Sequence, residues 1–465
     1  MLPAQAQDLL SADPPGAADA LGAVTAFDAA LVNGLARPDA ACADALAGLA
    51  GAVAGTPLAA PVADAVAKVT AGVLADAHLA ALAGARTALL GAVHDALLDA
   101  ADTALGRTRA VPADAPAPDP APSGALVGAR SWLTELAVTG WFGVDHDVAS
   151  GADTAIESLL ADPARRRLAV LLDGLAAELR ASSPVGTMGA VPARRWADLW
   201  TRAVLLSQDA APAGASGAAT EATGRLLLLG ADVHEHATAV QVQVHGVLEP
   251  ADGSAPRCVR AAVGAPKVDA VTGPSVWRLL TAHPVLLAAL AEHRAVDLTA
   301  MPLLDSGDLV WDDSRARAGD PADPFATARL HLDGAAVPAV PPLDRHPVRI
   351  AEPVLVEGYK VDRAAEELRL GDTRLPLDTG RLPAAGPLTA KLALASSACI
   401  GLLRWEAGRW SLQPLAVQAK VKGAVTAVHV GDWAKGPTDP KAAKAEERND
   451  AIGVLRERAG RLLRR

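Results

Sequence analysis

Three histidines lie close together near the middle of the chain: His234 and His236 flank Glu235, and His245 follows nine residues later. Alternate residues of a β-strand point to the same side, so His234 and His236 would present two imidazoles in one direction. His245 lies on the next predicted strand and could supply a third ligand if the two strands pair. Imidazoles in such a set are typical ligands of zinc. The alternative is that these histidines are exposed or hydrogen-bonded without an ion.

No other spacing of residues indicates catalysis. The sequence contains neither a phosphate-binding GxxxxGK[ST] loop nor the GxSxG or SxxK patterns of serine nucleophiles. Residues 311–323 carry four aspartates, which could collect Ca²⁺, but their spacing matches no EF-hand, and Arg315 and Arg317 would repel a cation. The sequence therefore predicts no catalytic residue and no cofactor, and it favours a protein that is not an enzyme.

The cysteines indicate a reducing compartment. Cys42, Cys258 and Cys399 are far apart and form no CxxC pair, so we expect buried free thiols rather than disulfides or a cysteine zinc site. The first residues lack the basic and apolar regions of a signal peptide, and no uncharged run is apolar enough to span a bilayer. We therefore expect a cytoplasmic, soluble protein with no membrane partner.

The composition can supply a large core. Hydrophobic residues make up 51% of the 465 residues and charged residues 21%, which excludes wholesale disorder. Alanine, leucine and valine dominate the apolar residues, while phenylalanine and tyrosine are nearly absent. The alanine content is typical of a GC-rich bacterial genome. The formal net charge of −10 bears on solubility rather than on the fold.

The N-terminal half is predicted to be helical. Residues 1–106 show apolar side chains at helical spacing and form an expected alanine-rich bundle. A proline-rich linker follows at residues 107–124, and a second helical domain is predicted over residues 125–207. Residues 208–223 are small and polar, which indicates a flexible linker. Asp162 and Pro163 provide a helix-start signal within the second helical domain.

The pattern changes to strands in residues 224–435. Residues 239–248 alternate valine with polar side chains, as a half-buried strand does. A hairpin is expected over Ile400–Val417, turning at Glu406-Ala407-Gly408. Further strands are expected at 225–230, 257–263, 326–333, 347–361 and 366–378, with helices near 274–293 and 388–398. Strands in runs favour a mixed or antiparallel sheet, so the fold class is α+β.

Residues 436–465 are predicted to form a basic C-terminal helix. From Lys420 onward there are eleven Lys and Arg against six Asp and Glu, a net charge of +5. This helix is a candidate docking element for a protein partner, or it is simply solvated. No aromatic residue lies among the cations of residues 441–465, so nucleic-acid binding is not favoured. The arginines that would carry the docking are Arg456, Arg458, Arg461, Arg464 and Arg465.

Two tryptophan-containing segments resemble a known family. Leu402–Val417 and, upstream, Pro192–Leu206 are similar to the region beyond the finger in bacterial SWIM zinc-finger proteins. The resemblance spans about residues 125–420 as a diffuse pattern rather than an invariant motif. The chain lacks the CxC and CxH ligands of that finger, so no zinc or nucleic-acid role carries over. The resemblance implies only a context: a companion protein in cassettes of MoxR-type AAA+ ATPases and von Willebrand A-domain proteins.

These patterns favour a non-catalytic adaptor or scaffold with protein partners, such as a AAA+ ATPase or a von Willebrand A-domain protein. The alternative is a metal-binding protein or metal-dependent enzyme that uses His234, His236 and His245.

Overall fold

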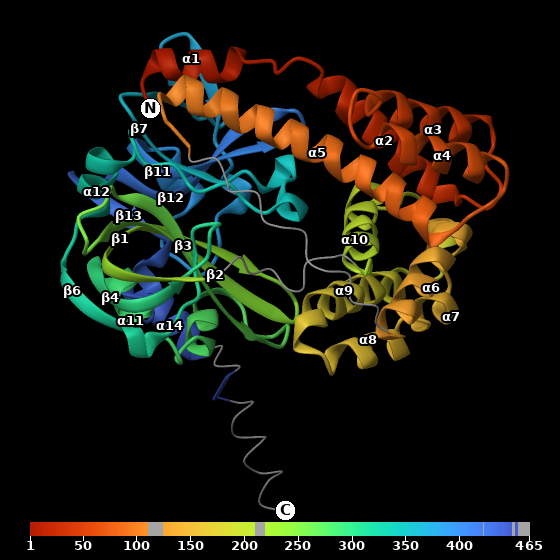
Figure 1. The fold of residues 1–465 in the computed structure, drawn as a ribbon. Helices are drawn as coiled ribbons and strands as arrows, with labels where there is room; N and C mark the ends of the chain where they lie inside the picture. Colours follow the sequence, from red (N-terminus) through yellow and green to blue (C-terminus); the bar gives the residue numbers. More distant parts are fainter. Residues whose placement is uncertain (110–123, 210–218, 422, 449–451, 454–465) are drawn as a thin grey trace, which may run out of the picture.

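A computed structural model of the chain describes residues 1–109, 124–209, 219–421, 423–448 and 452–453. Figure 1 shows a helical half built from the N-terminal residues and a β-rich half built from the C-terminal residues. The fold class is therefore α+β, as the change from helical to alternating periodicity predicted. In the described part of the chain, no helix combines the length and apolarity that crossing a membrane requires.

The helical half buries an apolar core of leucine, alanine and three fully packed tryptophans, Trp141, Trp196 and Trp200. The tryptophans fill the volume that phenylalanine supplies in most cores. The α-helices are α1 (Pro3–Ser11), α2 (Ala17–Asn33), α3 (Ala40–Ala52), α4 (Ala59–Thr70), α5 (Asp76–Leu105), α6 (Gly124–Thr139), α7 (His146–Ser150), α8 (Asp153–Leu160), α9 (Arg166–Ser182) and α10 (Ala193–Leu206). Short 3₁₀ turns are η1 (Trp141–Gly143), η2 (Pro163–Arg165) and η3 (Val185–Thr187).

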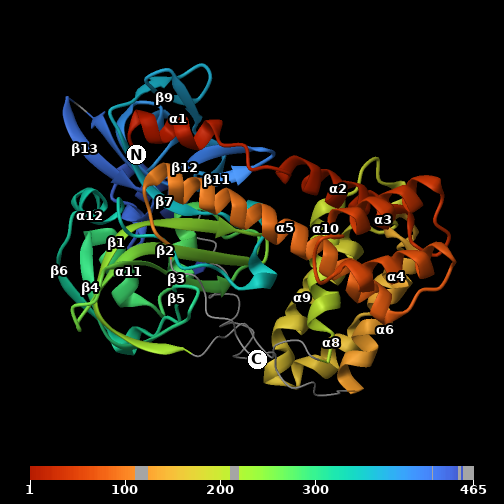
Figure 2. The same cartoon turned by 45° about the horizontal axis from the view of Figure 1, so that its top comes forward.

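Helix α5 connects the two halves. Its 30 residues begin among the other helices and end against the β-rich half, beside α1 (Figures 1 and 2). Leu79 to Leu90 belong to the helical core, whereas Val93 to Leu105 pack in the core of the β-rich half together with Ala6 and Leu9 of α1. The hydrophobic core thus crosses the domain boundary expected at residue 106.

Two arginines just after α5, Arg107 and Arg109, bind the chain to the β-rich half through ion pairs and hydrogen bonds. Arg109 donates to both oxygens of Asp102, at 2.8 and 2.9 Å, and to Glu352 Oε2 at 3.0 Å. Arg107 donates to the carbonyl oxygens of Leu332 and Pro353, each at 2.9 Å. The first residues of the predicted linker are therefore held to the β-rich half. Residues 110–123 lie outside the described part of the chain.

The first sheet of the β-rich half closes on itself. Strand β1 pairs with β2 on one edge and with β4 on the other, in the order β1-β2-β3-β5-β4, and β6 extends from β4. All pairs are antiparallel except β3 with β5, so the sheet is mixed. Its strands are β1 (Thr220–Glu235), β2 (Ala239–Pro250), β3 (Arg257–Pro266), β4 (Arg294–Leu303), β5 (Asp308–Leu309) and β6 (Ala316–Pro321).

A second, antiparallel sheet has the order β13-β12-β11-β7, and a small meander has the order β10-β9-β8. The predicted hairpin is confirmed: Glu406 pairs with Arg409, and Ala407 and Gly408 both have positive φ, as a type I′ turn requires. These strands are β7 (Glu352–Glu357), β8 (Lys360–Asp362), β9 (Glu367–Leu370), β10 (Thr373–Pro376), β11 (Ser396–Glu406), β12 (Arg409–Val421) and β13 (Ala424–His429).

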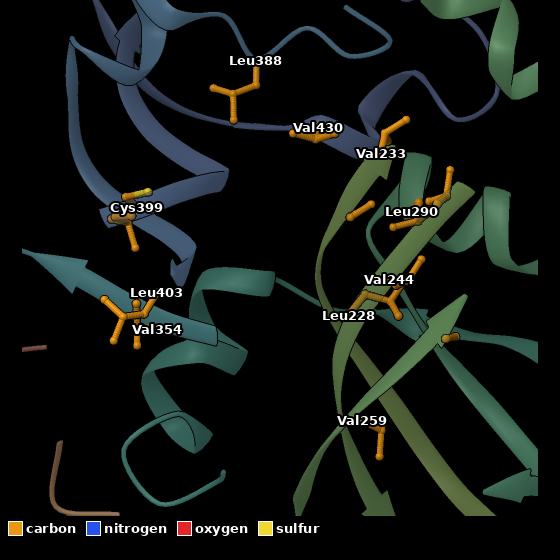
Figure 3. Close-up of a cluster of buried hydrophobic side chains, with 14 of the residues drawn as sticks. Leu228, Val233, Val244, Val259, Leu290, Val354, Leu388, Cys399, Leu403 and Val430 are labelled. Atoms are coloured by element: carbon orange, nitrogen blue, oxygen red, sulfur yellow. The ribbon is translucent and has the colours of Figure 1, made fainter. Parts of the chain in front are cut away.

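The two sheets share one core. Figure 3 shows Val354, Cys399 and Leu403 of the second sheet in the same cluster as Leu228 and Val244 of the first. Short helices lie between these strands and after the last of them. They are η4 (Gly273–Leu279), α11 (Pro284–Glu292), η5 (Asp313–Arg315), α12 (Pro324–His331), η6 (Pro342–Asp344), η7 (Pro347–Arg349), η8 (Thr379–Arg381), α13 (Ala390–Ala393), η9 (Val430–Trp433) and α14 (Pro440–Arg448).

The strand expected at residues 326–333 is wrong, because α12 occupies this segment. The Asp323 side chain accepts from the Phe325 amide, and Pro324 stands in the first turn, which together are a strong helix start. Phe325, Ala328 and Leu332 then face the core at helical spacing. Ala328, Leu330 and Leu332 also alternate with polar residues, as a strand would. An alternation this short does not distinguish a strand from a helix, and here the capped helix start decides for the helix.

Candidate metal centre

The structure places the sequence-predicted histidines in three different environments. His234 Nε2 lies 2.9 Å from Asp232 Oδ2. His236 is exposed just beyond the end of β1. His245 on β2 pairs in register with Gly230 and is fully buried. Among the described residues, these three do not form a set of metal-ligand atoms within reach of one ion.

Asp232 forms the centre of a polar cluster between the two sheets. Its carboxylate is 2% exposed and accepts from Arg404 Nη2 and Gln413 Nε2, both at 2.7 Å. Arg404 also donates to Gln413 Oε1, which completes the cluster. Burial by itself would raise the pKa of Asp232, but His234, Arg404 and Gln413 outweigh it and lower that pKa to about 2.

His245 lies near this cluster without joining it. Neither ring nitrogen has a hydrogen-bond partner. Burial lowers the pKa of His245 to about 3, and Arg260 adds to this effect. The ring is therefore neutral at physiological pH and costs stability through two unpaired nitrogen atoms.

A different set of residues forms the candidate site. His293, His429 and Asp432 each offer a ligand atom, and these atoms all lie within 4.8 Å of one another. His293 ends α11 and leads into β4, His429 is the last residue of β13, and Asp432 lies on η9. The site therefore joins the first sheet to the second, at the end of the β-rich half where α11 packs on η9.

The three side chains are already in contact. His293 Nε2 lies 2.7 Å from Asp432 Oδ1, and the other oxygen, Oδ2, accepts from the His429 amide at 3.0 Å. The two imidazole rings lie with their centroids 4.3 Å apart at 55°. One carboxylate thus orients both histidines, one through its ring and the other through its backbone.

His429 has an unpaired ring nitrogen. The residue is 3% exposed, and Nε2 is buried without a hydrogen-bond partner. The edge-to-face contact with Phe325, at 5.9 Å between centroids, closes one side of the ring. Burial lowers the pKa of His429 to about 4, and Asp432 opposes this only in part. A neutral imidazole with an unpaired nitrogen is the protonation state that a metal ion needs.

The backbone around the site is constrained. His293 ends α11 in the left-handed conformation, with φ +50°, and its amide donates to the Ala289 carbonyl, as is common at the end of a helix. Its carbonyl accepts from the Ala322 amide at 2.8 Å, and the neighbouring Glu292 pairs with Lys435 at 2.8 Å. These contacts hold the end of α11 against η9, so the position of the histidine is set by both elements.

The donor set fits a divalent transition metal. Two imidazoles and one carboxylate are the ligands that zinc and non-haem iron sites use, and three protein ligands leave a coordination position open. Tetrahedral zinc would separate its ligand atoms by about 3.3 Å, so the contact between His293 and Asp432 would lengthen slightly. The adjoining pocket measures only about 10 Å³, which is about the space of a single water.

Sequence reasoning missed this set because its members are far apart. His293 precedes Asp432 by 139 residues, and only the register of two separate sheets brings them together. The one local signal was the spacing of His429-Val430-Gly431-Asp432, which puts both side chains on one turn. The five tail arginines from Arg456 to Arg465, proposed for docking, lie outside the described residues.

Comparison with protein-family models, with curated protein sequences and with solved structures finds no match to this chain. The resemblance to SWIM zinc-finger proteins therefore stays a prediction, and the function has to be inferred from the chain's own geometry.

Proposed function

We propose that this chain is a metal-binding protein that holds one divalent transition-metal ion at His293, His429 and Asp432. The observation that carries the proposal is the buried, unpaired Nε2 of His429 beside the His293–Asp432 pair. A buried nitrogen without a partner costs free energy in the absence of a ligand. Zinc, which tolerates variable geometry, is the ion that best fits two imidazoles and one carboxylate.

The small pocket favours a structural or regulatory role over turnover. A space of about 10 Å³ beside the ligands admits no substrate larger than water. In contrast, the ligands come from elements on both sheets, so ligation would fasten η9 to the end of α11. The ligands are accessible enough for exchange of the ion, because the side chains of His293 and Asp432 are 35% and 20% exposed.

Metal content tests the proposal directly. We expect protein purified from its native host without chelators to retain about one zinc ion per chain, measured by elemental analysis. The variants His429→Leu and Asp432→Asn should lose it, because each removes one of three ligands. Cobalt added to chelator-treated protein should give the visible absorption of a four-coordinate site in the parent chain only.

The matched control is the double variant His234→Gln/His236→Gln, which removes the histidines singled out by sequence. It should keep the metal and the cobalt spectrum. Loss of metal in this control, with retention in His429→Leu, would place the ion at the β1 histidines and contradict the proposal. Protein that binds neither zinc nor cobalt would also contradict it.

Gly386 contacts η9, the element that carries Asp432, and so provides a test of how the ligand is positioned. A Cβ on Gly386 would overlap the carbonyl oxygen of Val430 and lie 3.0 Å from its Cα. Gly386→Ala should therefore displace η9 and weaken zinc binding by about 10- to 100-fold without changing a ligand. Competition with a chromogenic chelator measures the affinity. Gly334→Ala is the control, because a Cβ there meets nothing within 4 Å, and equal affinities in the two variants would argue against this role.

An adaptor role is a second candidate, favoured by a groove of about 660 Å³ between η4, α11 and α14. Trp277, Pro284 and Leu287 line its apolar side, and Glu446 and Glu447 line its rim. A AAA+ ATPase or a von Willebrand A-domain protein from the native host is the partner that the SWIM resemblance implies. Such a partner should co-purify with the parent chain and be lost in Thr281→Arg, which places a long charged side chain in the groove. Its absence from both samples would count against the adaptor role.

A further inference from the structure

Helices α9 and α10 form a groove on the surface of the helical half, far in sequence from the metal centre. Its volume is about 290 Å³. The α9 wall presents Arg167, Leu171, Gly174 and Glu178 at spacings of three and four residues. The α10 wall presents Arg195, Leu199, Arg202 and Leu206 at the same spacings. These spacings keep each set on one face of its helix, so the groove runs along both helices.

One end of the groove holds a buried cation with unused hydrogen-bonding capacity. Arg202 is 8% exposed, and its Nη2 has no hydrogen-bond partner. Its Nε lies 3.3 Å from Asp198, and its Nη1 only comes within 4.0 Å of Asp344. A buried guanidinium nitrogen without an acceptor is unfavourable, and the missing acceptor can come from a ligand in the groove.

The surroundings of Arg202 are short of negative charge. Asp344 is already paired with Arg167 at 2.8 Å, and Asp198 is shared with Arg86 at 3.8 Å. Burial lowers the pKa of Arg202, and the nearby Arg349 and Arg167 contribute to this against Asp198 and Asp344. An added anion would relieve this imbalance.

The rest of the groove is apolar or already neutral. Leu171 and Leu199 face each other across it, and Gly174 leaves its centre open, since a Cβ there would meet nothing within 4 Å. At the far end, Arg195 Nε donates to Glu178 at 2.8 and 2.9 Å, so these two charges satisfy each other. The groove therefore offers one guanidinium nitrogen without a hydrogen-bond partner, followed by hydrocarbon surface. This volume leaves room for a chain of several methylene groups.

We propose that this groove binds a small carboxylate on a short hydrocarbon chain, with the carboxylate on Arg202 and the chain between Leu171 and Leu199. This site lies in the other half of the protein and is independent of the proposed metal centre. A single carboxylate supplies the acceptor that Nη2 lacks, and a chain of a few methylene groups fills the remaining volume.

Calorimetric titration with octanoate, a single carboxylate on an unbranched hydrocarbon chain, tests the proposal. We expect a dissociation constant in or below the millimolar range. Arg202→Met keeps an unbranched apolar side chain without the guanidinium and should weaken binding about 10- to 100-fold, since a hydrogen bond to a charged group is lost. Arg180→Met is the matched control on α9, where the guanidinium pairs with Asp153 away from the groove, and it should bind as the parent does.

A second variant keeps the proposal testable if Arg202→Met folds poorly. Gly174→Leu adds a side chain where there is space and favours the helix, so it should fold well and block the hydrocarbon part of the groove. Octanoate binding should then be lost. Equal binding in the parent and in Gly174→Leu, or no binding in the parent, would overturn the proposal. Inorganic phosphate binding as tightly as octanoate would show that the hydrocarbon chain is not recognised and would overturn it as well.

Discussion

Replacing Asp232 by alanine should destabilise the folded chain by about 3–5 kcal/mol. The carboxylate is 2% exposed and compensates Arg404, whose side chain is 10% exposed between the two sheets. Removing it leaves a buried guanidinium without its counter-charge, and Gln413 without the acceptor of its amide. Urea unfolding, followed by tryptophan fluorescence and circular dichroism, measures the change in the free energy of unfolding.

The control is a double variant in which both charges are removed. Asp232→Leu with Arg404→Met should recover most of the loss, since replacing both members of a buried ion pair by apolar groups is often neutral or stabilising. A coupling of about 2 kcal/mol or more between the two sites is therefore expected. If Asp232→Ala cost less than about 1 kcal/mol, the carboxylate would have to be hydrated, and the cluster would not fasten the sheets.

Lowering the pH from 6.5 to 4.5 should cost the folded chain about 2 kcal/mol through His245 alone. The pKa of His245 is about 3 in the folded chain, below the ordinary value of about 6.5 expected after unfolding. The unfolded chain therefore takes up the proton first as the pH falls, and stability declines by about 1.4 kcal/mol per pH unit. The stability is fully present above pH 6.5 and is lost progressively toward pH 3.

His245→Leu isolates this contribution. The variant should have a shallower decline of stability between pH 6.5 and 4.5, and at pH 7 it should be at least as stable as the parent, because two unpaired buried nitrogens are removed. His346 and His429, whose pKa values burial lowers to about 4, add slopes that cancel in the comparison. Asp232, with a pKa of about 2, titrates below this range.

Val242→Ala is the control for a loss of packing without a titrating group. Val242 is fully buried on the opposite face of β2, and its truncation should lower stability by a similar amount at every pH. Parallel pH profiles for the parent and His245→Leu would mean that the pKa of His245 is the same in the folded and the unfolded chain. The neutral, unpaired state described for its ring would then be wrong.

The alternation of residues on β2 predicted the strand correctly but did not predict the burial of its polar face. The alternation of residues 239–248 correctly predicted a strand with valines on one side. It also indicated a solvated second face, yet His245 on that face is fully buried. The second sheet packs over this end of the strand, and a strand's own alternation cannot tell whether its polar face meets water or another sheet.

Periodicity, helix caps and turn residues depend only on neighbouring residues, so the sequence alone was enough to predict the elements that they define. They predicted the helical N-terminal half, the strand-rich C-terminal half and the hairpin that turns at Ala407-Gly408, because hydrogen bonds and side-chain directions within these elements depend on neighbours a few residues away. The division of the buried residues into two hydrophobic cores could not be predicted in this way, because it depends on which elements pack together. Helix α5 reads as one continuous helix, but half of it packs with the helices and half with the sheets.

The candidate sites depend on contacts between distant segments. His293 meets His429 and Asp432 because α11 packs against the turn that follows β13. Nη2 of Arg202 has no partner although Asp198 and Asp344 lie nearby, since Arg202 shares these carboxylates with Arg86 and Arg167. Residue spacing indicates neither the approach of His293 nor the sharing of these carboxylates. Ligand geometry and charge balance depend on distances of a few ångströms between side chains, and only packing in three dimensions brings those side chains together.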